Sequence, residues 1–184
     1  MTRRRVGEIL WERDGGGGSK TVERDWLPGK GQKATMQGGG SERISLRARA
    51  MNTGADIEAL LKSRVVAVVG CSPKASRPSN QVSQYLQESG YRVIPVHPGL
   101  DEVLGEKCYP DLLKIPEPVE VVVVFRRAEF ALEVARQAVE IDAKGLWLQD
   151  GILAPEAVDL ARKAGLKVVS DDCIMRQHLS RFGR

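Results

Sequence analysis

The sequence predicts an α/β protein with a Rossmann-like, doubly wound parallel sheet of about five strands in the order 3-2-1-4-5. Three observations support this fold class. Short runs of β-branched residues, such as 65–69, are apolar throughout and indicate strands buried on both faces. These runs alternate with helical patterns, as in parallel sheets. Gly70 ends the first run and Gly90 the helical pattern that follows it.

The first half of the domain contains two strands. Residues 56–63 form a first helix because their apolar side chains share one face. Strand 65–69 and helix 79–89 follow, and then strand 92–96. A loop from Pro98 to about Pro110 leads to a short helix at 111–114, and two further prolines end it.

The second half repeats the alternation. Residues 119–125 form the third strand, and 129–141 is an amphipathic helix with apolar residues at helical spacing. Strand 145–148 precedes helix 155–164, which Pro155 starts and Gly165 ends. Strand 167–170 and a short helix at 174–179 complete the pattern. Ligands bind such sheets at the carboxyl ends of the strands, which here means near the switch between strands one and four.

Composition limits the class of protein. The 184 residues suffice for one domain, and 42% hydrophobic and 28% charged residues are typical of a soluble protein. No apolar run approaches the roughly 20 residues of a membrane span, and no secretory signal is evident. The three cysteines predict neither a disulfide framework nor a metal site. We therefore expect a cytoplasmic protein without membrane association.

Residues 1–50 differ in composition from the rest of the chain. They carry 11 Lys and Arg against 6 Asp and Glu, and 10 of the 19 glycines, whereas residues 51–184 have a net charge of −1. So few apolar residues cannot offset the chain entropy lost on folding. We expect either a disordered tail or an artefactual extension before a start at Met51, and one domain over 51–184. The charge distribution argues against nucleic acid binding.

The loop after the first strand has the composition of a phosphate site. Its hydroxyls, its two cations and the helix N-terminus that follows attract anions. It lacks the further glycines of a dinucleotide fingerprint and the lysine of a Walker loop. The alternative is an ordinary polar loop in which Ser79 or Asn80 caps the helix. The candidate residues of this loop are Gly70, Cys71, Ser72, Pro73, Lys74, Arg77, Ser79 and Asn80.

The end of the second strand argues against NAD. A dinucleotide site has Asp or Glu there to bind the adenosine ribose. This chain has Val96, His97 and Pro98 instead, and the nearest acid, Asp101, lies further on. His97 can contact an adenine, or it can be an ordinary loop histidine.

Two further strand ends offer groups for a phosphorylated ligand. Arg126 can reach a phosphate and Phe125 can line an apolar channel, whereas Arg127 can simply pair with Glu129. Gln149 can hydrogen-bond a ligand amide. The rest of this candidate loop consists of Leu148, Asp150 and Gly151. No strong catalytic set stands out. Cys173 and His178 are five residues apart beside Asp171 and Asp172, which leaves a catalytic Cys–His pair as an alternative, and the two histidines and scattered thiols supply too few ligands for a metal site.

Several motifs together resemble a known family. They are Val-Ala-Val-Val-Gly-Cys-Ser (66–72), Arg-Pro-Ser-Asn (77–80), Gly-Tyr-Arg-Val-Ile-Pro-Val-His-Pro (90–98), Gly-Glu-Lys-Cys-Tyr-Pro (105–110), Val-Val-Phe-Arg (123–126), Leu-Trp-Leu-Gln-Asp-Gly-Ile (146–152) and Asp-Cys-Ile (172–174). With these motifs the chain resembles the stand-alone CoA-binding-domain proteins. These Rossmann-like proteins are similar to the CoA-binding domain of the succinyl-CoA synthetase α subunit. The resemblance leaves out residues 1–50.

The resemblance implies CoA bound across the strand ends. Ser72, Lys74, Arg77 and Asn80 would lie near the phosphates, and Val96 and His97 near the adenosine. Phe125 and Arg126 would meet the pyrophosphate or pantetheine, and residues 148–151 the pantetheine arm. Cys71 stands where alanine is more usual, and Asp172 where a basic residue often precedes the cysteine.

We therefore expect a protein that binds coenzyme A or an acyl-CoA without ligase chemistry of its own. The synthetase's catalytic histidine, ATP-grasp partner and second domain have no counterpart in the motifs. Two alternatives are an NAD(P)-dependent oxidoreductase and a CoA-responsive regulatory or interaction module, with a protein partner or a homo-oligomer. A mixed disulfide between Cys71 and CoA is a separate hypothesis.

Overall fold

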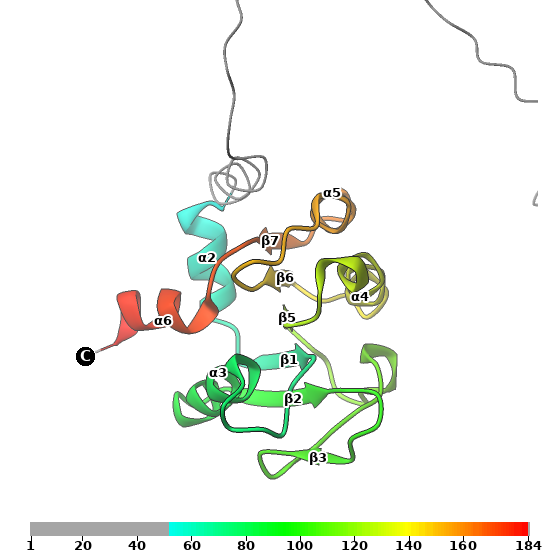
Figure 1. The fold of residues 1–184 in the computed structure, drawn as a ribbon. Coiled ribbons are helices and arrows are strands. Elements are labelled where there is room, and N and C mark those ends of the chain that lie inside the picture. Colours follow the sequence, from blue (N-terminus) through cyan, green and yellow to red (C-terminus); the bar gives the residue numbers. More distant parts are fainter. Residues whose placement is uncertain (1–51, 184) are drawn as a thin grey trace, which may run out of the picture. The chain divides into compact units, whose positions relative to one another are not determined.

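Five parallel strands form the central sheet of the computed structural model, which describes residues 52–183 (Figure 1). The strands are β1 (Val65–Val69), β2 (Arg92–Val96), β5 (Val121–Val124), β6 (Gly145–Leu148) and β7 (Lys167–Val169). The five-stranded α/β Rossmann-like fold predicted from the sequence is thus confirmed. The tail or extension expected at residues 1–50 lies outside the described residues.

Helices cover both faces of the sheet, as the doubly wound pattern requires. The helices are α2 (Gly54–Leu61), α3 (Pro78–Glu88), α4 (Ala128–Glu140), α5 (Pro155–Lys163) and α6 (Ile174–Phe182), with a 3₁₀ turn η1 at Leu112–Lys114. Helices α4 and α5 pack on one face, and α2, α3 and α6 on the other (Figure 1). Side chains alternate along a strand, so Ala67 and Val69 lie in the hydrophobic core between the sheet and helices α4 and α5. Val66 and Val68 lie in the core on the opposite face, beneath α2, α3 and α6.

The strand order corrects the prediction. The observed order is β2-β1-β5-β6-β7, so the third long strand pairs with the first and not with the second, and the order is 2-1-3-4-5. The outer edge of β2 is already occupied, since Tyr109 donates its N–H to the carbonyl of Pro95 at 3.0 Å. Pro95 also has no N–H to offer a further strand there, so β2 lies at the edge.

This order moves the point where ligands bind such sheets. The chain leaves β1 on one face and β5 on the other, so the topological switch lies between β1 and β5. The expected switch between the first and fourth strands is therefore wrong. The loops that follow β1 and β5 become neighbours.

Most elements occur where the pattern predicts them, and no end is shifted by more than three residues. One element is unexpected, a hairpin of β3 (Glu102–Val103) and β4 (Glu106–Lys107) within the predicted loop. Its turn contains Leu104 and Gly105, both with positive φ. No helix between residues 52 and 183 has the length and apolar character to span a membrane.

Candidate functional site

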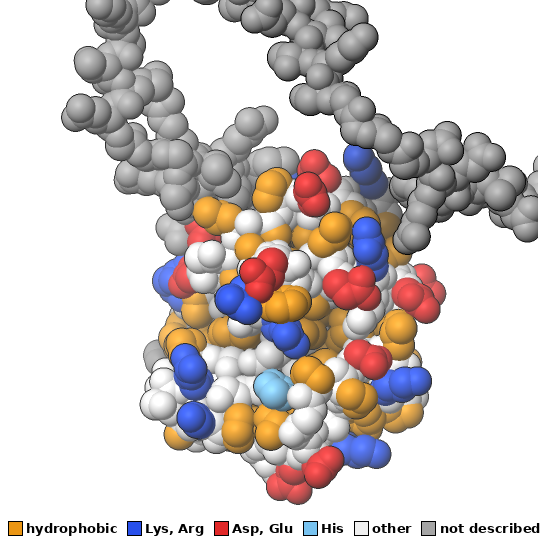
Figure 2. Space-filling view, turned by 45° about the vertical axis from the view of Figure 1, so that its right-hand side comes forward, with side chains coloured by type: hydrophobic (Ala, Val, Ile, Leu, Met, Phe, Trp, Pro, Cys, Tyr) orange, Lys and Arg blue, Asp and Glu red, His pale blue; other side chains and the backbone are white. Residues whose placement is uncertain are grey.

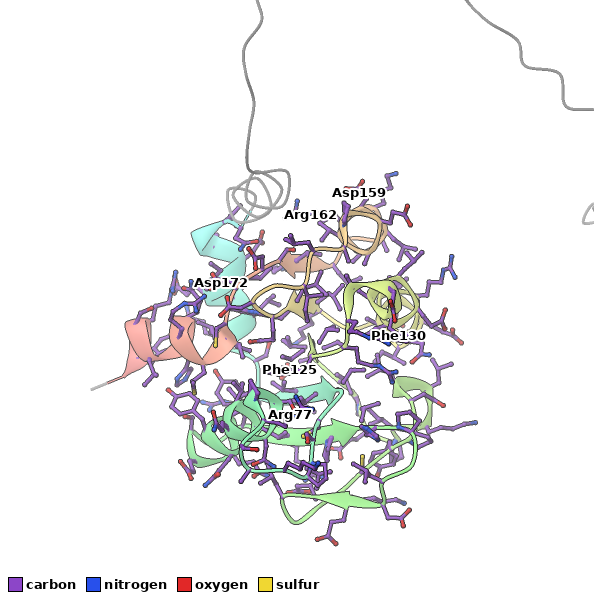
Figure 3. All side chains as sticks on the ribbon, viewed as in Figure 1. Arg77, Phe125, Phe130, Asp159, Arg162 and Asp172 are labelled. Atoms are coloured by element: carbon purple, nitrogen blue, oxygen red, sulfur yellow. The ribbon has the colours of Figure 1, made fainter. Side chains whose placement is uncertain are left out.

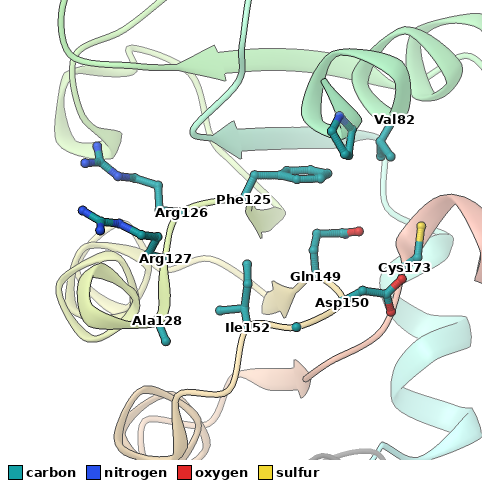
Figure 4. Close-up of a pocket in the computed structure, with 11 residues that line it drawn as sticks. Val82, Phe125, Arg126, Arg127, Ala128, Gln149, Asp150, Ile152 and Cys173 are labelled. Atoms are coloured by element: carbon teal, nitrogen blue, oxygen red, sulfur yellow. The ribbon is translucent and has the colours of Figure 1, made fainter. Parts of the chain in front are cut away.

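An open pocket of about 550 Å³ lies at the carboxyl ends of β5 and β6 (Figure 4). It is built from the loops after these two strands, the first turns of α3 and the start of α6. Arg126 and Arg127 lie on one side, Cys173 lies on the opposite side, and Gln149 is between them (Figure 4). The residues that line it are Pro78, Val82, Phe125, Arg126, Arg127, Ala128, Gln149, Asp150, Gly151, Ile152 and Cys173.

A smaller pocket of about 130 Å³ adjoins the first through Arg126, which lines both. Val96 and Pro98 from the end of β2 contribute to its wall, together with Phe130 on α4. Phe130 and Asp172 lie to either side of Phe125 in the whole-molecule view (Figure 3). The two pockets therefore offer a path along the carboxyl edge of the sheet, from β2 to the start of α6.

The two arginines after β5 differ in their surroundings. The Arg126 guanidinium lies over the ring of Phe130, 4.5 Å from its centroid, and the side chain is half-buried. Arg127 is exposed and pairs with Glu129 at 2.9 Å, which is the simple pairing that the sequence allowed. Arg126 is thus the cation held in place at the junction of the pockets.

Gly70 lets the loops after β1 and β5 touch. Its φ is +87°, and a Cβ atom at this position would lie 3.0 Å from Cγ of Arg126 and 3.3 Å from the carbonyl carbon of Phe125. Any larger residue would both strain the backbone and press on this loop. Gly70 therefore allows the Arg126 side chain to lie close to the end of β1.

The polar residues of the loop after β1 bond mainly to one another. Ser72 N–H donates to Ser79 Oγ at 3.1 Å, and Asn80 Nδ2 donates to the carbonyl of Ser72 at 2.9 Å. Ser79 and Asn80 are buried, and the helix cap is Arg77 without a side-chain bond, not Ser79 or Asn80. These serine and asparagine contacts fix the shape of the loop.

The remaining groups of this loop do not line either pocket. Pro73, Lys74 and Arg77 are exposed, and Arg77 lies at the start of α3 (Figure 3). The Cys71 thiol is fully buried beside Ser83, and this burial raises its pKa. Cys71 is therefore packed as a small core residue, away from the pocket.

The end of β2 supplies an unpartnered nitrogen. His97 anchors the strand end through its backbone, donating to the carbonyl of Tyr109 at 2.9 Å. Its Nδ1 is buried and has no hydrogen-bond partner within residues 52–183. Val96 and Pro98 line the smaller pocket, whereas His97 lies beside them.

Gln149 is the most informative residue of the larger pocket. Its side chain is only 4% exposed, and its Nε2 has no hydrogen-bond partner in the described part of the chain. A buried amide without a partner costs about 1–3 kcal/mol, so this nitrogen is the polar group of the pocket that an acceptor entering it would stabilise. Leu148, the preceding candidate, is wholly in the core and does not line the pocket.

The far end of the pocket is held by a charged network. Arg176 on α6 forms two bonds of 2.8 Å to the carboxylate of Asp150 and one of 2.6 Å to Asp172. These bonds, the one to Asp150 foremost, raise the pKa of Arg176. Gly151 N–H donates to Asp171 Oδ1 at 2.7 Å, which also fixes this loop. The loop after β6 is thus tied to the start of α6.

Cys173 lines the pocket, although the sequence did not indicate it as a ligand-binding residue. It is half-buried, precedes α6 as its N-cap, and lines the pocket next to Asp172 in the chain. The Asp-Cys-Ile motif is part of the family resemblance, but nothing in the sequence indicates that it lies close to Gln149. Val82, Ala128 and Ile152 were also missed, because they contribute only apolar surface.

The chemistry of this site suits an elongated, phosphorylated ligand. Arg126 can bind phosphate, the aromatic and aliphatic walls can hold an apolar chain, and Gln149 can donate to a carbonyl. The surface view shows a hollow with hydrophobic side chains in its floor and charged side chains at its rim (Figure 2). No cluster of three or more metal-ligating side chains occurs among residues 52–183.

Comparison with known proteins agrees with this chemistry. A family model described as a CoA binding domain matches residues 64–178. The uncharacterized protein YneT of Bacillus subtilis is 40% identical over 121 residues, which are 66% of this chain and 90% of that protein. A solved hypothetical protein from Pyrococcus horikoshii is 42% identical with a TM-score of 0.68, covering 71% of this chain and 92% of its own.

A longer relative is an enzyme. The ADP-forming acetate–CoA ligase I of Archaeoglobus fulgidus is 30% identical over 128 residues. The match covers 64% of this chain but only 19% of that ligase.

Proposed function

The chain belongs to the CoA-binding domain family, and from that premise we propose that it binds coenzyme A or an acyl-CoA in the pocket at the ends of β5 and β6. The observation that carries the proposal is the buried, unpartnered amide of Gln149. The pantetheine arm of CoA contains amide carbonyls, which are the acceptors that this amide lacks. A ligand carbonyl there would remove the cost of burying Nε2 unpaired.

The remaining groups of the site fit the rest of the ligand. Arg126, at the junction of the two pockets, binds phosphate groups, and Phe125 and Ile152 hold the aliphatic part of the arm. The adenosine lies toward Val96 and His97, where the free Nδ1 of His97 offers a further bond. Lys74 and Arg77, exposed on the adjacent loop, add positive charge to the phosphate side.

This function is binding without ligase chemistry of its own. The match covers 19% of the ligase relative, and the described residues that line the pocket include no histidine to act as the synthetase's catalytic residue does. NAD is a poorer fit, because no carboxylate stands at the end of β2 to bind the ribose.

Calorimetric titration of the full chain in the presence of a reductant tests the proposal. We expect saturable binding of CoA with a dissociation constant in the micromolar range, which corresponds to a binding free energy of roughly −8 kcal/mol. NAD at the same concentrations should give no binding heat. Binding of NAD without CoA would contradict the proposal.

A further inference from the structure

Cys173 places a thiol in the wall of the pocket, and non-covalent binding of a ligand does not need a thiol there. It lies on the side of the pocket opposite Arg126, with Gln149 between them (Figure 4). Along this line the pocket offers a phosphate binder, then a buried amide donor, then a sulfur. Coenzyme A has the same order of groups, from phosphates through amides to a terminal thiol.

The other two cysteines of the chain are not available in this way. Cys71 is fully buried against Ser83, and Cys108 is buried near the backbone of His97. Burial raises the pKa of both thiols, which lowers their reactivity. Neither lines the pocket, whereas Cys173 is half-buried in its wall.

The start of α6 holds Cys173 at a defined place. Asp172 accepts the backbone N–H of Cys173 at 2.9 Å and pairs with Arg176 at 2.6 Å. Arg176 in turn holds Asp150, which lines the same pocket. The backbone of Cys173 is therefore held relative to the loop that carries Gln149.

We propose that Cys173 forms a mixed disulfide with the terminal thiol of the bound ligand, so that the pocket is a site of reversible thiol modification by coenzyme A. This inference rests on the proposed function. The thiolate of Cys173 attacks one sulfur of CoA disulfide, a Cys173–S–S–CoA bond forms, and the CoA–S–S–CoA bond breaks. The released CoA thiolate takes up the proton that Cys173 lost. CoA disulfide is the oxidant, and a dithiol reductant reverses the step.

The test is intact mass measurement of the full chain after incubation with CoA disulfide, followed by peptide mapping. We expect a mass increase of one CoA moiety, located on Cys173 and removed by dithiothreitol. Binding makes the exchange intramolecular, so it should be at least about tenfold faster than with glutathione disulfide at equal concentration. Cys173→Ser should abolish the adduct, and Cys108→Ser should retain it.

The results separate this inference from the proposed function. An adduct mapped to Cys71 or Cys108, or equal rates with both disulfides, would overturn the assignment to Cys173. If CoA binds under reducing conditions but no adduct forms, the inference alone fails. If CoA does not bind in the calorimeter and no adduct forms, both fail.

Discussion

At Gln149, the stability of the free protein and the binding of a ligand make opposite demands on the side chain. Its Nε2 is buried without a partner within the described chain, so the free protein bears a desolvation cost. A ligand carbonyl would relieve that cost. Functional sites often contain such locally unfavourable groups.

Replacement of Gln149 by leucine should therefore affect the two properties in opposite directions. We expect CoA affinity to fall about tenfold, while the free energy of unfolding stays unchanged or rises by up to about 1 kcal/mol, because an unpaired buried amide is removed. Calorimetric titration and urea denaturation measure these. Gln84→Leu, at an exposed position of α3, is the control and should leave affinity unchanged. A destabilised variant with normal affinity would show that the amide is structural.

Arg126 is the second residue with a sharp expectation. Loss of a charge-assisted phosphate contact in Arg126→Ala should weaken CoA binding by about 10- to 100-fold. The affinity of the wild type should also fall with added salt, and that of the variant should fall less. Arg136→Ala is the matched control, because this exposed arginine lies on helix α4, away from the pockets, and pairs with Glu133. Equal affinities for both variants would remove Arg126 from the site.

At the scale of elements, the end of the sheet opposite the site depends on one carboxylate. Glu120, just before β5, accepts the N–H of Arg64 and Val65 and the ammonium of Lys144. It thus ties together the segments that start β1, β5 and β6. The Lys144 bond above all, with the two N–H groups, lowers the pKa of Glu120 to about 2.

The stability of the fold should therefore depend on Glu120 in a particular pH range. A carboxyl whose pKa is lowered on folding stabilises the protein above its unfolded value near 4.5, and this is lost as the pH falls toward about 2. Glu120→Gln should cost about 1–2 kcal/mol at pH 7, allowing for partial exposure, and much less near pH 2.5. Urea denaturation at both pH values measures this. Glu140→Gln, an exposed control on α4, should cost little at either, and a Glu120→Gln effect independent of pH would contradict the prediction.

The elements themselves could be predicted from local sequence, but not their order. Runs such as Val121–Val124 are buried on both faces, and this alone makes them continuous apolar segments. Whether β5 pairs with β1 or with β2 depends on whether the outer edge of β2 can accept another strand. Pro95 indicates that it cannot, because proline is rare in a strand that has neighbours on both sides, and this argues against the predicted order. The β3–β4 hairpin has two-residue strands, too short to show a period.

At the scale of the whole molecule, the residues of the candidate pocket could be predicted where they follow the end of a strand. Phe125, Arg126, Gln149, Asp150 and Gly151 follow buried strands, and the structure brings all of them to one pocket. Cys173 could not be found in this way, because its place depends on how α6 packs across the sheet. The composition of the loop after β1 predicts phosphate binding. In the folded chain, however, most of its polar groups form hydrogen bonds with one another, and the sequence does not show this.

Ligand binding should be visible as stabilisation of the whole fold. CoA at a concentration of about 100 times its dissociation constant should add about 2.7 kcal/mol to the free energy of unfolding. For a domain of this size that raises the melting temperature by roughly 5–10 °C. Differential scanning calorimetry with CoA and with NAD measures this. No shift with CoA, or an equal shift with NAD, would contradict specific binding.

Strand β6 carries a natural optical probe. Trp147 is the sole tryptophan of residues 52–183; it is fully buried, and its indole N–H donates to the carbonyl of Asp172 at 2.7 Å. That carbonyl immediately precedes Cys173, so any movement at the start of α6 changes the surroundings of the indole. In a chain with Trp11 and Trp26 replaced by phenylalanine, fluorescence emission would report events at the pocket without an added dye.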